Sequence, residues 1–186
     1  MEAFLISTGI VALAEIGDKT QLLALLLAAR FKKPWPIVWG ILVATVLNHA
    51  MAGALGAWIT SLISPQTLRW MLGASFIAMA LWMLIPDSLN DDADKKPVRF
   101  GVFGTTLLLF FAAEMGDKTQ VATVMLAARF DAFVAVVAGT TLGMMLANVP
   151  VVLLGERMTR LVPLQVVRIA SAVVFLGLGV FALMAK

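Results

Sequence analysis

Four carboxylates carry most of the chemistry that this sequence could perform. They occur in two copies of one segment, Glu-x-Gly-Asp-Lys-Thr-Gln, at residues 15–21 and 114–120, and only the second position differs. Within each copy the Glu precedes the Asp by three residues, so on a helix both side chains would project from one face about one turn apart. Carboxylate oxygens are hard ligands that favour Mg, Ca or Mn over copper. The pattern predicts a divalent metal site, with these ligands: Glu15, Asp18, Glu114 and Asp117.

The remaining residues of the two segments could support such a site. The Thr and Gln side chains offer neutral oxygens, and a glycine inside a helix permits a local opening that releases backbone carbonyls. Each Lys follows its Glu by four residues, the helical spacing of an ion pair. With both lysines counted, the segments sum to about minus two, which one divalent cation or two protons would neutralise. The possible supporting residues are Thr20, Thr119, Gln21, Gln120, Lys19 and Lys118.

The elements that must position these residues are membrane helices. Of the 186 residues, 61% are hydrophobic and 13% are charged, a balance that indicates a lipid environment. Hydropathy and the placement of proline predict spans at about 3–30, 36–62, 68–86, 100–129, 133–156 and 165–185. Without Cys the chain has no thiolate site, and one His excludes a site of several imidazoles.

The two segments belong to a repeat that covers the whole chain. Shifting the sequence by 99 positions aligns residues 15–21 with 114–120 and residues 27–31 with 126–130. Because each copy holds three spans, the second copy must enter the membrane upside down. We therefore predict an all-α membrane protein with six transmembrane helices in two inverted three-helix repeats, residues 1–87 and 100–186, joined by a linker at 88–99.

Basic residues indicate how this protein is oriented. They lie in short groups at the ends of the spans, which is typical of topology signals and not of nucleic-acid binding. Most of them follow spans one, three and five, which places both termini in the periplasm and the linker in the cytoplasm of a bacterial inner membrane. The first group comprises Arg30, Lys32, Lys33, Lys95, Lys96, Arg99, Arg157, Arg160 and Arg168; the opposite side has Arg69, Arg129 and Lys186.

Buried charge requires the two segments to face each other. A charged side chain in the membrane costs about 2.5 to 3.5 kcal/mol, so exposure to lipid is disfavoured. An inverted repeat brings equivalent segments together near the midplane. A structural alternative is that the charges form ion pairs between helices. The offset also pairs His49 with Asn148, which could line the cavity, relay protons or join helices by hydrogen bonds. Close helix packing is predicted at Gly40, Gly53, Gly56, Gly139 and Gly143.

With its doubled motif, the sequence resembles the GDT-type cation/proton exchanger family, which includes bacterial MneA-like manganese exporters. The family pattern is E-x-G-D-[KR]-[TS], and residues 15–20 and 114–119 both match it. The resemblance implies export of Mn²⁺, or of Ca²⁺, in exchange for protons. It also implies that Glu15, Asp18, Glu114 and Asp117 coordinate the metal, which is the transported substrate and not a cofactor.

Two other function classes remain open. An intramembrane hydrolase could use paired acids as general acid and base, but an enzyme has little need of two equivalent copies, so we expect no enzyme. An exporter of small organic cations could use the same carboxylates. Such a site would favour an aromatic cage, and the chain contains no Tyr. The expected partners are a divalent cation, protons and the lipid bilayer, with the oligomeric state left open.

Overall fold

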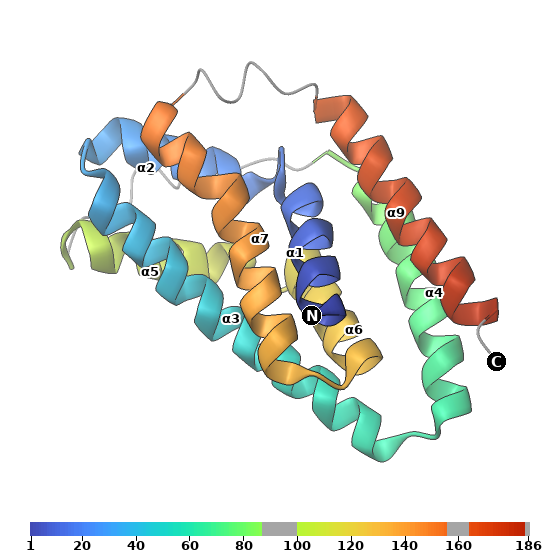
Figure 1. The fold of residues 1–186 in the computed structure, drawn as a ribbon. Helices are drawn as coiled ribbons and strands as arrows, with labels where there is room; N and C mark the ends of the chain where they lie inside the picture. The colour runs from blue at the N-terminus through green and yellow to red at the C-terminus, as the bar shows by residue number, and fades with distance from the viewer. Residues whose placement is uncertain (87–99, 156–163, 185–186) are drawn as a thin grey trace.

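The computed structural model describes residues 1–86, 100–155 and 164–184, and most of these residues lie in helices (Figure 1). The predicted linker at 88–99 lies outside the described residues. The helices, in chain order, are α1 (Glu2–Glu15), α2 (Lys19–Phe31), α3 (Pro34–Leu62), α4 (Pro65–Met83), α5 (Gly101–Glu114), α6 (Lys118–Phe130), α7 (Phe133–Leu154) and α9 (Leu164–Met184). The all-α prediction is confirmed.

The helix boundaries repeat along the chain at the offset found in the sequence. Helices α1, α2, α3 and α4 begin 99 residues before α5, α6, α7 and α9, respectively. Helices α1 and α5 have 14 residues each, and α2 and α6 have 13 residues each. The sequence repeat therefore corresponds to a repeat of secondary structure.

Two of the predicted spans are broken. The segments predicted as continuous at 3–30 and 100–129 each form two helices, with the break at Gly17 and Gly116. A helix of 14 residues is about 21 Å long, which is shorter than the roughly 30 Å of a bilayer core. Among the described helices, α3, α7 and α9 have the length and apolar composition needed to cross a membrane.

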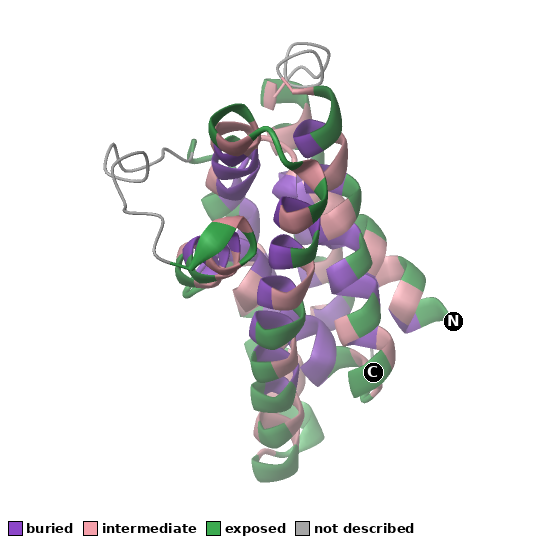
Figure 2. Cartoon of the chain, turned by 90° about the vertical axis from the view of Figure 1, so that its left-hand side faces the viewer, coloured by how far each residue is buried: buried purple, intermediate pink, exposed green. Residues whose placement is uncertain are grey.

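Helices from the two halves of the chain pack against each other. Helix α1 packs on α7, α3 packs on α5 and α6, and α4 packs on α9. The α4 and α9 pair lies on one side of the molecule, while α2 and α5 lie on the other (Figure 1). The buried residues form stripes on the inward faces of the helices, and exposed residues cover the outward faces (Figure 2).

Glycines permit the closest of these contacts, as the sequence predicted. A Cβ atom at Gly56 would lie 2.3 Å from the Val124 carbonyl oxygen of α6, and one at Gly139 would lie 2.5 Å from the Phe4 carbonyl oxygen of α1. Only a residue without a side chain allows backbones to approach this closely. Helices α3 and α7 thereby reach the broken helices of the opposite half.

Candidate metal site

The break in the first half is built by the segment itself. Helix α1 ends at Glu15, and Gly17 has a positive φ of 84° that glycine adopts without strain. Asp18 caps α2, because its Oδ2 accepts a hydrogen bond from the Thr20 amide at 3.2 Å. Gln21 reaches back, and its Oε1 accepts from the Gly17 amide at 2.9 Å. These contacts satisfy backbone donors that the break would otherwise leave unpaired.

The second copy repeats this arrangement. Helix α5 ends at Glu114, and Gly116 has a φ of 72°. Asp117 Oδ2 accepts a hydrogen bond from the Thr119 amide at 3.5 Å, and Gln120 Oε1 accepts from the Gly116 amide at 2.7 Å. The Gly, Asp, Thr and Gln of each segment therefore have a local structural role. The Gln oxygens, which were predicted as possible ligands, are used by these amides.

The break changes how the acids of one segment meet. They do not share a face of one continuous helix as predicted, because Glu15 ends α1 whereas Asp18 caps the start of α2. Carboxylate oxygens of Glu15, Asp18 and Asp117 nevertheless gather within 4.8 Å of one another, and all three residues are buried. The two segments therefore face each other, and three of the four predicted ligands form one cluster, which we call the acidic cluster.

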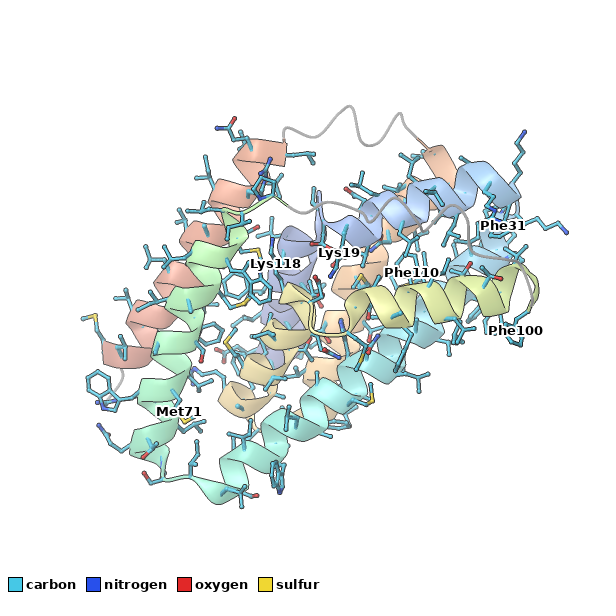
Figure 3. All side chains as sticks on the ribbon, turned by 180° about the vertical axis from the view of Figure 1, so that it is seen from behind. Lys19, Phe31, Met71, Phe100, Phe110 and Lys118 are labelled. Carbon is cyan, nitrogen blue, oxygen red and sulfur yellow. The ribbon has the colours of Figure 1, made fainter. Side chains whose placement is uncertain are left out.

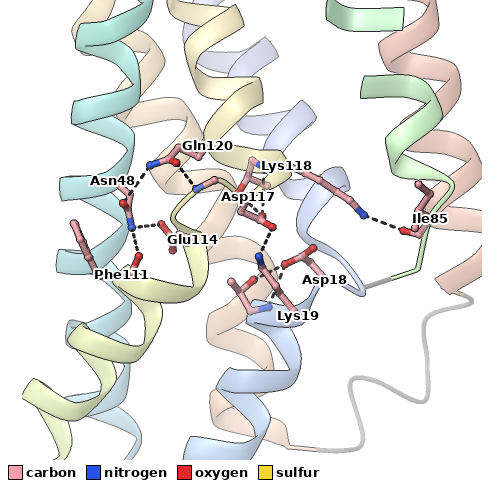
Figure 4. Close-up of polar contacts among 12 residues, drawn as sticks. Asp18, Lys19, Asn48, Ile85, Phe111, Glu114, Asp117, Lys118 and Gln120 are labelled. Carbon is pink, nitrogen blue, oxygen red and sulfur yellow. Dashed lines mark hydrogen bonds and ion pairs between the residues drawn. The ribbon is translucent and has the colours of Figure 1, made fainter. Parts of the chain in front are cut away.

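Glu114, the fourth predicted ligand, is not part of the acidic cluster. Its carboxylate accepts hydrogen bonds from Thr45 Oγ1 at 2.9 Å and from Asn48 Nδ2 at 3.2 Å, both on α3 (Figure 4). Asn48 also donates to the Phe111 carbonyl oxygen at 3.1 Å. Glu114 is therefore turned toward α3 and held there by neutral donors.

Lys19 and Lys118 have different partners, although both lie in the middle of the molecule (Figure 3). The helical spacing that would pair each Lys with the Glu four residues earlier does not apply, because the helix is broken between them. Lys19 Nζ instead lies 2.8 Å from Asp117 Oδ1 of the other segment. Lys118 Nζ donates to the Ile85 carbonyl oxygen after α4 at 2.9 Å (Figure 4). One lysine thus balances the acidic cluster, and the other joins α6 to the end of α4.

Asn148 of α7 holds the remaining glutamate. Its Nδ2 donates to Glu15 Oε1 at 3.3 Å and to the Met144 carbonyl oxygen at 3.1 Å. Glu15 Oε2 and Asn148 Oδ1 are buried and accept no hydrogen bond from the residues that the structure describes. Two buried oxygens, a carboxylate oxygen of the acidic cluster itself and an amide oxygen beside it, are therefore available.

His49 was also predicted as a possible supporting residue. His49 is fully buried, and neither of its ring nitrogens has a hydrogen-bond partner among the described residues. Sequence reasoning missed Thr45 and Asn48, which hold Glu114. Their spacing of three residues on one helical face was the available signal, but the offset of 99 directed attention to His49.

Comparisons with known proteins identify the family of this chain. The family model described as "Divalent cation/proton antiporter GDT1" matches residues 3–91 and 102–186. The chain is 50% identical over 177 residues to a Vibrio cholerae protein named "Putative manganese exporter", covering 95% of this chain and 88% of that one. It is 30% identical to "GDT1-like protein sll0615" of Synechocystis, covering 84% of each chain.

More distant relatives occur in plants. The chain is 26% identical to "GDT1-like protein 3" of Oryza sativa subsp. indica, over 96% of this chain and 72% of the rice protein. No solved structure matches the chain. The family model covers both halves, including both acidic segments. This chain is therefore a member of the GDT1 family of divalent cation/proton antiporters.

Proposed function

We propose that this protein exports a divalent cation, with Mn²⁺ as its preferred substrate, across a bacterial inner membrane in exchange for protons. The observation that carries the proposal is the acidic cluster of Glu15, Asp18 and Asp117, whose oxygens lie within 4.8 Å of one another. Oxygens that ligate Mg²⁺ or Ca²⁺ lie roughly 2.0 to 2.6 Å from the ion, so ligands on opposite sides of one ion are about 4 to 5 Å apart. The cluster has the dimensions of a site for one ion.

The donor set favours a hard cation. It consists of the carboxylates of the acidic cluster, including the buried Glu15 Oε2, with the neutral Asn148 Oδ1 nearby. Sites made of oxygen alone suit Mg, Ca or Mn. The name of the Vibrio cholerae relative, at 50% identity, supports manganese among these ions. We therefore assign the metal to Glu15, Asp18 and Asp117, with Asn148 as a supporting ligand.

The transport mechanism that we propose uses two inverted repeats of three spans each, residues 1–87 and 100–186. Each broken pair, α1 with α2 and α5 with α6, counts as one discontinuous span. In transporters, such broken helices carry ion sites near the midplane, where the two repeats meet. The shared helix boundaries at an offset of 99 residues support this arrangement.

Proton coupling follows from the chemistry of the ligands. A carboxylate that binds a metal ion must be deprotonated, so protons and metal compete for the same oxygens. A dry cavity cannot accumulate the charge of both. Alternation between metal-bound and proton-bound carboxylates therefore gives exchange.

Purified protein in liposomes with a metal-sensitive dye inside tests this function. We expect an imposed proton gradient to drive Mn²⁺ uphill, with Ca²⁺ carried more slowly and Mg²⁺ least. If Mn²⁺ movement does not depend on the proton gradient, the protein is a uniporter or a channel and not an exchanger. Absence of metal movement in any gradient would reject metal transport, and the organic-cation alternative would then be tested in the same liposomes with basic amino acids.

A further inference from the structure

The two glutamates of the repeated segment belong to the same kind of backbone turn. Helix α1 ends at Glu15 and α5 ends at Glu114, and in each turn the amide of the Asp donates to the carbonyl oxygen of the Glu at 3.0 Å. The backbone angles φ and ψ are −78° and 166° at Asp18, and −79° and 165° at Asp117. The charge of Glu114 also acts on Glu15 and Asp117. The backbone therefore does not explain why Glu114 stays outside the acidic cluster.

Two donors on one face of α3 hold the Glu114 carboxylate away from the cluster. Thr45 Oγ1 donates to Glu114 Oε1 at 2.9 Å. Asn48 Nδ2 donates to Glu114 Oε2 at 3.2 Å (Figure 4). Asn48 is itself fixed, because its Oδ1 accepts from Gln120 Nε2 at 3.3 Å and its Nδ2 also donates to the Phe111 carbonyl oxygen. Both oxygens of this buried carboxylate thus have a donor.

The first half of the chain has neither of these donors. At the offset of 99 residues, the two donor positions of α3 correspond to Met144 and Ala147 of α7, whose side chains cannot donate a hydrogen bond. Glu15 is held by Asn148 through Oε1, and its Oε2 accepts no hydrogen bond from the residues that the structure describes. The glutamate that is held through one oxygen lies in the acidic cluster, and the glutamate that is held through both lies outside it.

We propose that Thr45 and Asn48 are positioning residues that limit the metal site to three carboxylates, an inference that rests on the proposed function. A hard divalent cation binds more tightly as the number of charged ligands rises. A transporter must also release its ion, so binding has to stay weak enough for the ion to leave. By holding Glu114 on α3, the two donors keep the affinity of the acidic cluster below that of a site with four carboxylates.

Substitution of Thr45 tests this role, because its hydroxyl donates to Glu114. Thr45→Val keeps the shape of the side chain and removes the donor, so that the Glu114 carboxylate is released toward the metal. We expect the Mn²⁺ affinity of full-length protein in nanodiscs, measured by calorimetry, to rise by about tenfold. In liposomes, the KM for Mn²⁺ should fall together with the maximal transport rate. Thr45→Ser keeps a hydroxyl and should retain the affinity of the unmodified chain.

Two controls separate positioning of Glu114 from general stability. Thr140 of α7 is also fully buried, but its hydroxyl donates within its own helix, to the Val137 carbonyl oxygen at 3.1 Å. Thr140→Val should therefore leave the Mn²⁺ affinity unchanged. The gain in affinity must also depend on the carboxylate that is released. In a Glu114→Gln background, Thr45→Val should not tighten Mn²⁺ binding, because the amide adds no charge to the site.

A purely structural role of Thr45 gives a different result. Thr45→Val would then bind Mn²⁺ as the unmodified chain does, or more weakly, and either outcome overturns the positioning role. An equal gain in the Glu114→Gln background overturns it as well. Should Thr45→Val fail to fold, Thr45→Ala removes the same donor and must also tighten binding. The unmodified chain reports on the proposed function separately. If it binds Mn²⁺ and the Thr45 variant gains nothing, the positioning role alone is refuted, whereas absence of Mn²⁺ binding by both chains refutes the metal function as well.

Discussion

The two glutamates occupy equivalent positions in the sequence but have different partners in space. Glu15 is held by Asn148 of α7, whereas Glu114 is held by Thr45 and Asn48 of α3. At the offset of 99 residues, Asn148 corresponds to His49 and not to Asn48. A displacement by one residue turns a helical side chain by about 100°. The amide that reaches each glutamate therefore comes from a different angle, and the two halves of the site are not identical.

At the residue scale, we predict that each of the four carboxylates is required for transport. Glu15→Gln, Asp18→Asn, Glu114→Gln and Asp117→Asn should reduce Mn²⁺ uptake into liposomes by at least about 100-fold. At Glu15, Asp18 and Asp117 the change removes a charge-assisted ligand contact worth about 3 kcal/mol. At Glu114 it removes a buried carboxylate that Thr45 and Asn48 hold outside the acidic cluster. Since Glu114 is outside the acidic cluster, Glu114→Gln should lose less Mn²⁺ affinity in calorimetry than Glu15→Gln. Membrane insertion should persist in all four, and substantial transport by most of them would disprove the site.

Proton competition gives a second prediction at this scale. Mn²⁺ affinity should fall as the pH falls, because protonated carboxylates do not ligate metal, and binding near neutral pH should release protons. Calorimetry in buffers that differ in ionisation enthalpy counts the released protons. A Mn²⁺ affinity that stays constant between about pH 5.5 and 8 contradicts exchange at shared carboxylates.

At the scale of elements, the broken helices decide where the charges lie. Each break ends one helix at a Glu and caps the next with an Asp, so two carboxylates and the ends of two helices come close together. The C-terminal end of a helix carries partial negative charge and favours cations. The arrangement needs glycine at both breaks, where φ is 84° at Gly17 and 72° at Gly116.

Alanine substitution separates backbone strain from side-chain crowding at these glycines. An added Cβ at Gly17 would lie 2.8 Å from Leu164 Cδ2, whereas at Gly116 it meets no atom within 4 Å. Both variants adopt a strained φ that costs about 1 kcal/mol or slightly more. We therefore expect Gly116→Ala to lower the unfolding temperature in detergent by roughly 2 to 4 °C, and Gly17→Ala to lower it further. Equal unfolding temperatures for Gly116→Ala and the unmodified chain would show that the second break tolerates a side chain.

At the scale of the whole molecule, the reversed distribution of basic residues between the halves predicts the orientation. The connection at 87–99 should be cytoplasmic, and both termini should be periplasmic. In intact cells, Ala93→Cys should resist a membrane-impermeant thiol reagent, whereas Ser64→Cys should react. The chain has no native Cys, so each variant carries a single thiol. The opposite labelling pattern would require the inverse orientation.

The sequence by itself determined the helical class, the repeat, most helix boundaries and the identity of the charged residues. These features are local: hydropathy selects the helices, prolines and caps end them, and a doubled segment is visible without any knowledge of contacts. Even the break at Gly17 was visible as a weak point of the helix, although the consequence for Glu15 and Asp18 was not.

Only the tertiary structure decided which charged groups meet. Lys19 pairs with Asp117, and Glu114 with Asn48, across 98 and 66 residues of chain, respectively. Such contacts depend on how far each broken helix turns and on how closely glycine-lined helices approach. A change of one residue in register rotates a polar group out of reach, and no local pattern records that rotation. The partners of the charges were therefore fixed by helix packing between the two halves.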